Sequence, residues 1–150
     1  MADGTAPDYG GYERQKNDIN YKYSTDSTTN AYGRFLGQQR YERQSGDAMR
    51  AYGRAYPGYK ANFGQRGFGG GGVNSGAMKQ SMNRYVGDFT QDYGRMQQDQ
   101  TLEQQQYELQ QKNSDQWRQQ ALQDVETTKA NDIANAALNL QYWQQMMGAL

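Results

Sequence analysis

The sequence predicts an all-α fold in which extended long helices are joined by a Gly-rich hinge, with an irregular N-terminal arm and little independent core. Leu, Ile, Val and Phe supply only 16 of the 150 residues, below the roughly one-fifth share typical of chains that build their own core. The remaining apolar residues recur at helical spacing on both sides of one segment. That segment contains four consecutive glycines, which cannot hold a helix.

Residues 1–30 are predicted to form an extended N-terminal arm. Gly4, Pro7, Gly10 and Gly11 interrupt any helical pattern, and residues 24–30 are a polar cluster that favours turns. The arm's tyrosines offer a large contact area at a small entropy cost. We therefore expect the arm either to lie along a neighbouring subunit or to fray as a free terminus.

Residues 31–64 are predicted to form a Tyr/Gly-rich helical segment. Its glycines weaken the helix by up to about 1 kcal/mol each relative to Ala, and Pro57-Gly58 is expected to end or kink it. The apolar residues that share one helical face are Tyr41, Ala48, Tyr52, Tyr56, Tyr59 and Phe63.

Residues 65–76 are predicted to be the hinge. Asn74 or Ser75 is a suitable N-cap for the helix that follows. The glycines assigned to the hinge are Gly67, Gly69, Gly70, Gly71, Gly72 and Gly76.

Residues 77–150 are predicted to form a long Gln-rich helix or a helical hairpin that bends at residues 113–115. Six apolar residues near the start form a stripe with an eleven-residue repeat, which favours a straight or slightly right-handed bundle. We expect this stripe to be an interface between helices. Its members are Met78, Met82, Tyr85, Phe89, Tyr93 and Met96.

A second apolar stripe lies near the end of the sequence and has a seven-residue repeat. Its predicted interface residues are Ile133, Leu140, Trp143 and Met147, with Ala136 and Leu150 in the same register. Gln and Asn rather than Lys or Arg line the opposite face, which favours packing in a bundle over insertion into a membrane interface. Between the stripes, apolar residues at 102, 109 and 117 face the other way, so the helix is expected to touch two different partners.

The composition argues against several chemistries. The chain has no His and no Cys, which removes the commonest general base and the thiol nucleophile. We therefore expect no enzyme activity and assign no catalytic, cofactor-binding or metal-binding residue. Gly67-x-Gly69-x-x-Gly72 matches a dinucleotide pattern, but no predicted strand precedes it. No apolar run is long enough to span a membrane.

The run from Arg66 to Met78 (Arg-Gly-Phe-Gly-Gly-Gly-Gly-Val-Asn-Ser-Gly-Ala-Met) is flanked on both sides by Tyr-, Arg- and Gln-rich helical sequence. This arrangement, over about residues 30–110, resembles small virion proteins of tailed bacteriophages, in which an Arg-Gly-apolar turn and a Gly/Ser-Gly segment join two helices. The chain departs from that pattern in having four glycines where one or two would serve. The resemblance implies a structural role in the tail, the head-to-tail connector or the ejected proteins.

These observations predict a structural subunit of a virion. Its expected partners are other virion proteins and copies of itself in a symmetric homo-oligomer. A genome-associated nucleic-acid-binding protein is the alternative, using Arg14, Arg34, Arg54 and Arg66 with the neighbouring tyrosines. Zero net charge disfavours it, because such proteins normally carry a basic face. A disordered hydrophilic protein that needs no partner is a third interpretation.

Overall fold

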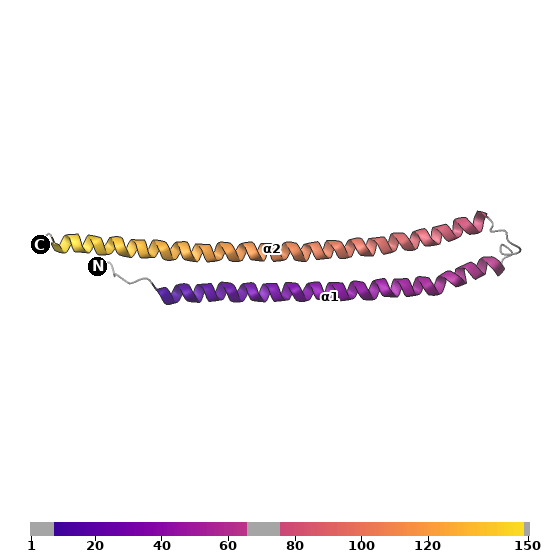
Figure 1. Ribbon diagram of the computed structural model, residues 1–150, viewed down its shortest axis with the longest axis horizontal. Helices are drawn as coiled ribbons and strands as arrows, with labels where there is room; N and C mark the ends of the chain where they lie inside the picture. Colours follow the sequence, from indigo (N-terminus) through magenta and orange to yellow (C-terminus); the bar gives the residue numbers. More distant parts are fainter. Residues whose placement is uncertain (1–7, 66–75, 149–150) are drawn as a thin grey trace. The chain divides into compact units, whose positions relative to one another are not determined.

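The computed structural model describes residues 8–65 and 76–148, and these residues contain two long helices and no strand. Helix α1 spans Tyr9–Phe63 and helix α2 spans Gly76–Gly148 (Figure 1). The predicted all-α class with long helices is confirmed. Of the predicted hinge glycines, Gly67 and Gly69–Gly72 lie outside the described residues, as do both candidate N-caps, whereas Gly76 is the first residue of α2.

The prediction of an extended arm over residues 1–30 is wrong from Tyr9 onward, because α1 begins there. Asp8 caps the helix: the Gly11 amide donates to the Asp8 carboxylate Oδ1 at 2.9 Å. This bond satisfies one of the backbone donors that a helix start leaves open. A Cβ on Gly11 would lie 2.6 Å from Asp8 Oδ2. Gly11, one of the glycines that suggested a helix break, thus makes room for the cap.

The polar cluster at residues 24–30 is also helical, contrary to the prediction of turns. The hydroxyl of Thr25 donates to the carbonyl of Tyr21 at 3.0 Å, and that of Thr28 donates to the carbonyl of Ser24 at 2.8 Å. Hydroxyls that bond back by one helical turn leave the helix backbone intact. Side chains expected to compete with the helix are therefore accommodated within it.

Neither helix ends where an interruption was expected. Helix α1 continues through Pro57 as far as Phe63, so of the two alternatives at Pro57-Gly58, an end or a kink, the end is wrong. Helix α2 runs without a break through residues 113–115. The hairpin alternative is therefore wrong for this helix, and the single-helix alternative is correct.

The chain divides into two compact units, and both helices contribute to each. Unit 1 comprises the described residues of Met1–Ala31 and Glu108–Leu150, and unit 2 is Tyr32–Tyr107. Within unit 1, Tyr12 contacts Asp132 and Tyr23 contacts Asp115, so the two helical segments are antiparallel. Within unit 2, Tyr59 bonds Ser81 at one end and Gly33 faces Tyr107 at the other, which gives the same antiparallel pairing.

The side chains that α1 and α2 turn toward each other follow one eleven-residue period in both helices. We call these residues the seam of each helix. An eleven-residue repeat corresponds to about 3.67 residues per turn, which favours helix pairs with little supercoil. The partly or fully buried positions that recur at this period are 12, 16, 19, 23, 27, 30, 37, 41, 45, 48, 52, 56 and 59 in α1 and 78, 82, 85, 89, 93, 96, 100, 104, 107, 111, 115, 118, 122, 125 and 129 in α2. Further partly buried positions are 11, 33, 39 and 46 in α1 and 81, 103, 114, 117, 121 and 136 in α2.

The core between these helices is very small. Tyr12 and Val125, which are 7% and 8% exposed, are the only buried large apolar side chains among the residues described. The other seam side chains keep contact with solvent. Little independent core is what the composition predicts.

Candidate functional site

The seam of unit 2 is aromatic. The Tyr52 ring stacks on Phe89 with ring centroids 4.1 Å apart and on Tyr85 at 5.4 Å. The Tyr59 ring stacks on Tyr85 at 4.8 Å, and its hydroxyl lies 2.7 Å from the hydroxyl of Ser81. Such ring pairs contribute roughly 0.5–1.5 kcal/mol beyond the area they bury. A tyrosine ring can stack on its neighbour and also form a hydrogen bond through its hydroxyl. It can therefore hold two helices together next to solvent, where an aliphatic side chain would form no hydrogen bond.

Tyrosine pKa values in this seam reflect its packing. Partial burial raises the pKa of Tyr52, and the neighbouring hydroxyls of Tyr56 and Tyr85 add to the shift. The hydrogen bond with Tyr41 raises the pKa of Tyr93. The neutral phenol is therefore the form that this seam stabilises.

Two glycines of α1 admit large α2 side chains at the other end of unit 2. A Cβ on Gly33 would lie 2.8 Å from Cε1 of Tyr107, and a Cβ on Gly37 would lie 3.0 Å from Cδ of Glu103. Arg40, one turn on, reaches the same Glu103 carboxylate at 3.7 Å. Glycine at these positions leaves room for the two α2 side chains, which a larger residue would force to shift.

The seam of unit 1 combines polar pairs with the two buried apolar side chains, Tyr12 and Val125. Tyr12 donates a hydrogen bond to the carboxylate of Asp132, and this bond is the main reason that the pKa of Tyr12 is raised to about 12. Tyr23 donates to Asp115 at 2.7 Å, and this bond likewise raises the pKa of Tyr23. Gln111 joins the second pair by donating to Asp115 at 3.1 Å.

Charged groups reinforce the same seam. Lys16 forms an ion pair with Glu126, which is the main cause of the lowered pKa of Glu126 and the raised pKa of Lys16. Three cations lie over aromatic rings. The Lys22 ammonium is 4.4 Å from the Trp117 centroid, the Arg118 guanidinium carbon is 4.7 Å from that of Tyr23, and the Lys129 ammonium is 5.9 Å from that of Tyr9. Unit 1 is thus held by specific polar pairs that fix which residues face each other.

The structure divides the predicted interface residues into two groups. Met78, Met82, Tyr85, Phe89, Tyr93 and Met96 are all partly buried in unit 2, where the aromatic members contact α1 of the same chain. Ile133, Leu140, Trp143 and Met147 are 39%, 61%, 51% and 74% exposed. The first stripe therefore has a partner within the chain. The second lies beyond Asp132, the last α2 residue for which the structure shows a bond to α1.

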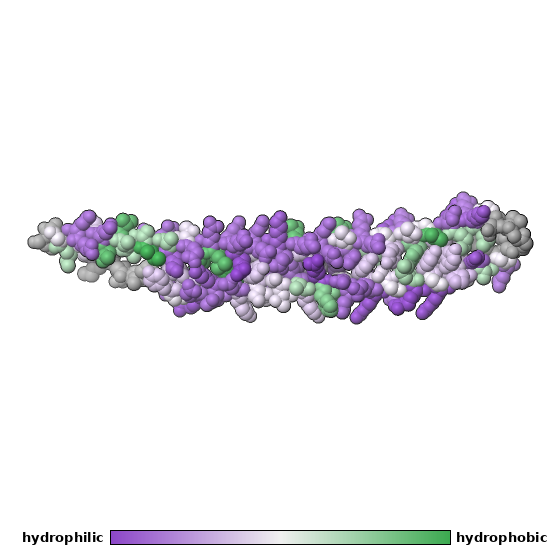
Figure 2. Space-filling model, viewed as in Figure 1, coloured by the Kyte–Doolittle hydropathy of each residue, from purple (hydrophilic) through white to green (hydrophobic). Residues whose placement is uncertain are grey.

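Exposed apolar side chains are numerous for a chain of this composition. Figure 2 shows a largely hydrophilic face on which hydrophobic residues gather over the C-terminal part of α2, with smaller patches elsewhere. Leu102 and Leu109 are 50% and 59% exposed, in agreement with the prediction that they face away from the first stripe. The same prediction is wrong for Trp117, which is partly buried beside Lys22 of α1.

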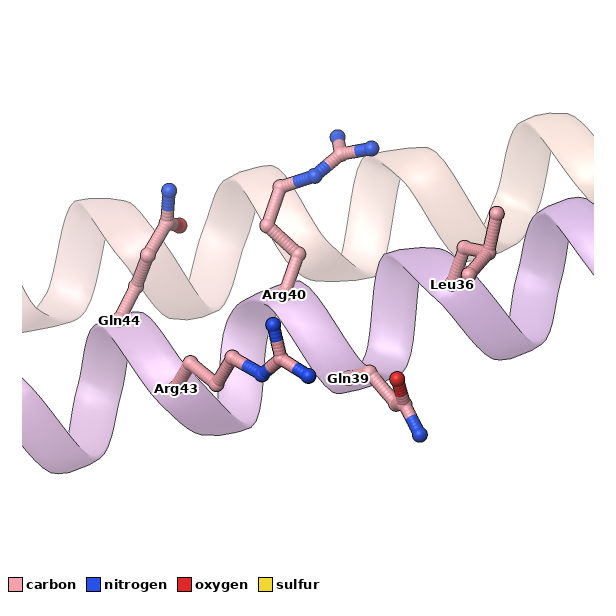
Figure 3. A pocket seen from close by; sticks show the side chains of 5 residues that line it. All are labelled: Leu36, Gln39, Arg40, Arg43 and Gln44. Carbon is pink, nitrogen blue, oxygen red and sulfur yellow. The ribbon is translucent and has the colours of Figure 1, made fainter.

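Some of the surface cations are paired with nearby carboxylates. Arg14 pairs with Asp8 at 3.3 Å, Arg50 with Asp47 at 2.6 Å, and Arg95 with Asp92 at 3.7 Å. One hollow is lined by α1 side chains alone (Figure 3). Its two arginines, Arg40 and Arg43, are accompanied by the neutral side chains of Leu36, Gln39 and Gln44. A hollow built from one face of one helix has no opposing wall with which to enclose a small molecule.

Residues 8–65 and 76–148 offer neither a metal-binding cluster nor a membrane-spanning helix. In these ranges no three His, Cys, Asp or Glu side chains gather closely enough to hold a metal ion. Neither described helix is long and apolar enough to cross a membrane.

Sequence reasoning missed the polar seam of unit 1 and the Asp8 cap. Tyr12 and Tyr23 are eleven residues apart, the same period as the first stripe. That spacing was the available signal for a helix there. The acidic partners Asp115 and Asp132 carry no apolar signal and are recognisable only once the pairing of the helices is known.

Comparisons with protein-family models, with curated proteins and with solved structures gave no match to this chain.

Proposed function

We propose that the chain is a non-enzymatic structural subunit of a phage virion, ordered by packing against copies of itself and other virion proteins in the tail, the head-to-tail connector or the ejection apparatus. One observation carries the proposal: among the described residues only two large apolar side chains are buried, while sixteen are substantially exposed. The virion assignment within this class follows the resemblance of the Arg66–Met78 run.

Apolar burial within one copy of the chain is too small to account for its ordered helices, which supports assembly with neighbouring subunits. Burial of apolar surface contributes about 25 cal/mol per Å², whereas fixing the backbone costs roughly 1–2 kcal/mol per residue. Two buried residues and a partly exposed seam offset only a fraction of that cost. Neighbouring subunits that cover the exposed apolar groups supply the remainder.

The isolated chain provides the first test. Circular dichroism and sedimentation velocity of the purified protein should show a broad thermal transition and a mass that depends on concentration. A compact monomer that melts in one sharp cooperative step would contradict the proposal, because it would show that the chain needs no partner.

Particles of the phage that encodes the chain provide the second test. Mass spectrometry of gradient-purified particles should detect the chain in a fixed copy number, and a wash in high salt should not remove it. Particles that assemble and infect normally without the chain would exclude a structural role.

The genome-binding alternative receives less support from the charges. Of the arginines assigned to that role, Arg14 is opposed by Asp8, and the net charge of the chain is zero, whereas phosphate binding releases counterions through unopposed cations. Arg66 lies outside the described residues. A salt-sensitive gel shift with double-stranded DNA would favour the alternative. No shift at low salt would dispose of it.

A further inference from the structure

The last turns of α2, residues 133–148, differ in charge from the rest of the described chain. No Asp, Glu, Lys or Arg occurs in this segment, and the last charged residue before it is Asp132. The seam of unit 1 that precedes it depends on charged partners, including the Lys16–Glu126 ion pair and the Tyr12–Asp132 hydrogen bond. The segment is therefore built for a different kind of contact from the one that pairs α1 with α2.

Apolar side chains in this segment form two stripes on different sides of the helix. The heptad stripe consists of Ile133, Ala136, Leu140, Trp143 and Met147, and the second stripe consists of Leu138, Tyr142 and Met146. At roughly 100° per residue, the centres of the two stripes lie about 140° apart around the helix. One partner helix cannot cover both stripes. Each stripe requires a neighbour of its own.

Both stripes are exposed among the residues described. Within the heptad stripe Leu140 and Trp143 are 61% and 51% exposed, and within the second stripe Leu138 and Tyr142 are each 62% exposed. Seven large apolar side chains of residues 133–148 are exposed, four in the heptad stripe and three in the second stripe. At about 100 Å² each, one stripe offers about half of the roughly 800 Å² per partner of a standard interface. Stable association through this segment therefore requires both stripes to be covered, which favours an assembly of several copies over a dimer.

The absence of charge indicates which occupant fits. A nucleic acid needs cations, and helices that lie on membrane surfaces carry Lys and Arg on the polar face. Residues 133–148 have none. A second copy of the same uncharged helix meets no like charge, and its Gln and Asn side chains can bond to one another. The seven-residue spacing of the heptad stripe also suits packing between separate helices.

We propose that residues 133–148 join copies of this chain to one another, each copy contacting two neighbours through its two stripes in an assembly larger than a dimer. The proposal rests on the proposed function in that it names one partner of the structural subunit. Its test uses the purified chain alone. A failure would therefore remove the homotypic contact without deciding whether the chain occurs in particles.

Three consecutive residues offer a matched set of variants. Leu140→Lys places a charge in the heptad stripe, Tyr142→Lys places one in the second stripe, and Gln141→Lys places one between them. Lys favours helix about as well as Leu or Gln, so circular dichroism should show unchanged helicity for all three. The variants then differ only in the side of the helix that carries the charge.

Sedimentation equilibrium of the full chain measures the outcome. We expect a wild-type mass above two copies of 17.1 kDa, a smaller assembly or at least tenfold weaker association for Leu140→Lys and Tyr142→Lys, and no change for Gln141→Lys. A monomeric wild type, a dimer that responds to only one stripe, or equal effects of all three variants would overturn the proposal. A wild type that stays monomeric but binds neutral phosphatidylcholine vesicles would assign the segment to a lipid surface instead.

Discussion

At the scale of single residues, the glycines of α1 fall into two kinds. Gly33 faces Tyr107 so closely that a Cβ would lie 2.8 Å from the ring, whereas a Cβ on Gly53 would meet nothing within 4 Å. The first kind lets the helices approach each other. The second only weakens the helix, because glycine gains more freedom on unfolding than any other residue.

The two kinds predict opposite outcomes for the same substitution. Gly53→Ala should stabilise α1 by roughly 0.5–1 kcal/mol, and Gly33→Ala should give no gain or a loss because the Tyr107 ring must move. The temperature at which half of the helical circular dichroism signal is lost measures both. Equal stabilisation by the two substitutions would show that α1 and α2 do not approach each other closely at Gly33.

Tyr12 makes the stability of unit 1 depend on pH in the alkaline range. Its pKa is raised to about 12, chiefly by the hydrogen bond to Asp132, from an ordinary value of 10.0. The folded state holds the Tyr12 proton more tightly than the unfolded state does. The resulting contribution to the free energy of unfolding is therefore complete below pH 10 and is lost as the pH rises from about 10 to 12.

Tyr12→Phe removes that contribution. The variant should be less stable than the wild type at pH 8, and the difference should shrink as the pH approaches 12. Thermal transitions followed by circular dichroism between pH 8 and pH 12 measure the difference, with the exposed Tyr21→Phe as the control. A difference that stays constant over this range would show that the Tyr12 proton is not linked to stability.

At the scale of elements, the aromatic seam should hold unit 2 together. Phe89 is partly buried against Tyr52, so Phe89→Asp would place a carboxylate among rings and cost roughly 1–3 kcal/mol. Leu102→Asp, on the exposed side of the same helix, should change stability by no more than about 0.5 kcal/mol.

Amide hydrogen exchange of the isolated chain separates the two variants. Phe89→Asp should accelerate exchange in residues 45–59 of α1 as well as around residue 89, because those residues lose their partner. Leu102→Asp should leave exchange in α1 unchanged. If Phe89→Asp affected α2 alone, the contact between the seams would not stabilise α1.

The helical segments that could be predicted from the sequence were those with periodically spaced apolar residues. Met78 to Met96 and Tyr41 to Phe63 identified helices from spacing alone, and residues 8–65 and 76–148 bear this out. The helical state of residues 9–30 was not predicted, because glycines and hydroxyl side chains carry a local preference for turns. Tertiary partners reverse that preference: Tyr12 and Tyr23 each bond an aspartate of α2.

The candidate site was predictable only in part, for a related reason. Spacing placed Met82 and Phe89 on one face but did not reveal that the facing helix belongs to the same chain. The polar partners Asp115 and Asp132 become recognisable only when the pairing of the helices is known.

At the scale of the whole molecule, the two units rely on different forces and should respond differently to salt. Unit 1 depends largely on the Lys16–Glu126 ion pair and on three cations over aromatic rings. Unit 2 depends mainly on stacked rings, with one cross-helix ion pair from Arg40. Raising the ionic strength from 0.1 M to 1 M shortens the screening length from about 10 Å to 3 Å, which weakens exposed charge pairs and leaves apolar contacts intact.

Hydrogen exchange of the full chain at the two salt concentrations tests this difference. Exposed pairs contribute about 0.2–1 kcal/mol, so amides of residues 12–30 should exchange up to roughly fivefold faster in 1 M NaCl, while those of residues 45–59 should not accelerate. Lys16→Gln should reduce the salt response of unit 1, and Arg50→Gln, which removes an exposed pair with Asp47 in unit 2, should not. Equal acceleration in both stretches would show that the polar seam contributes no more electrostatic stability than the aromatic one.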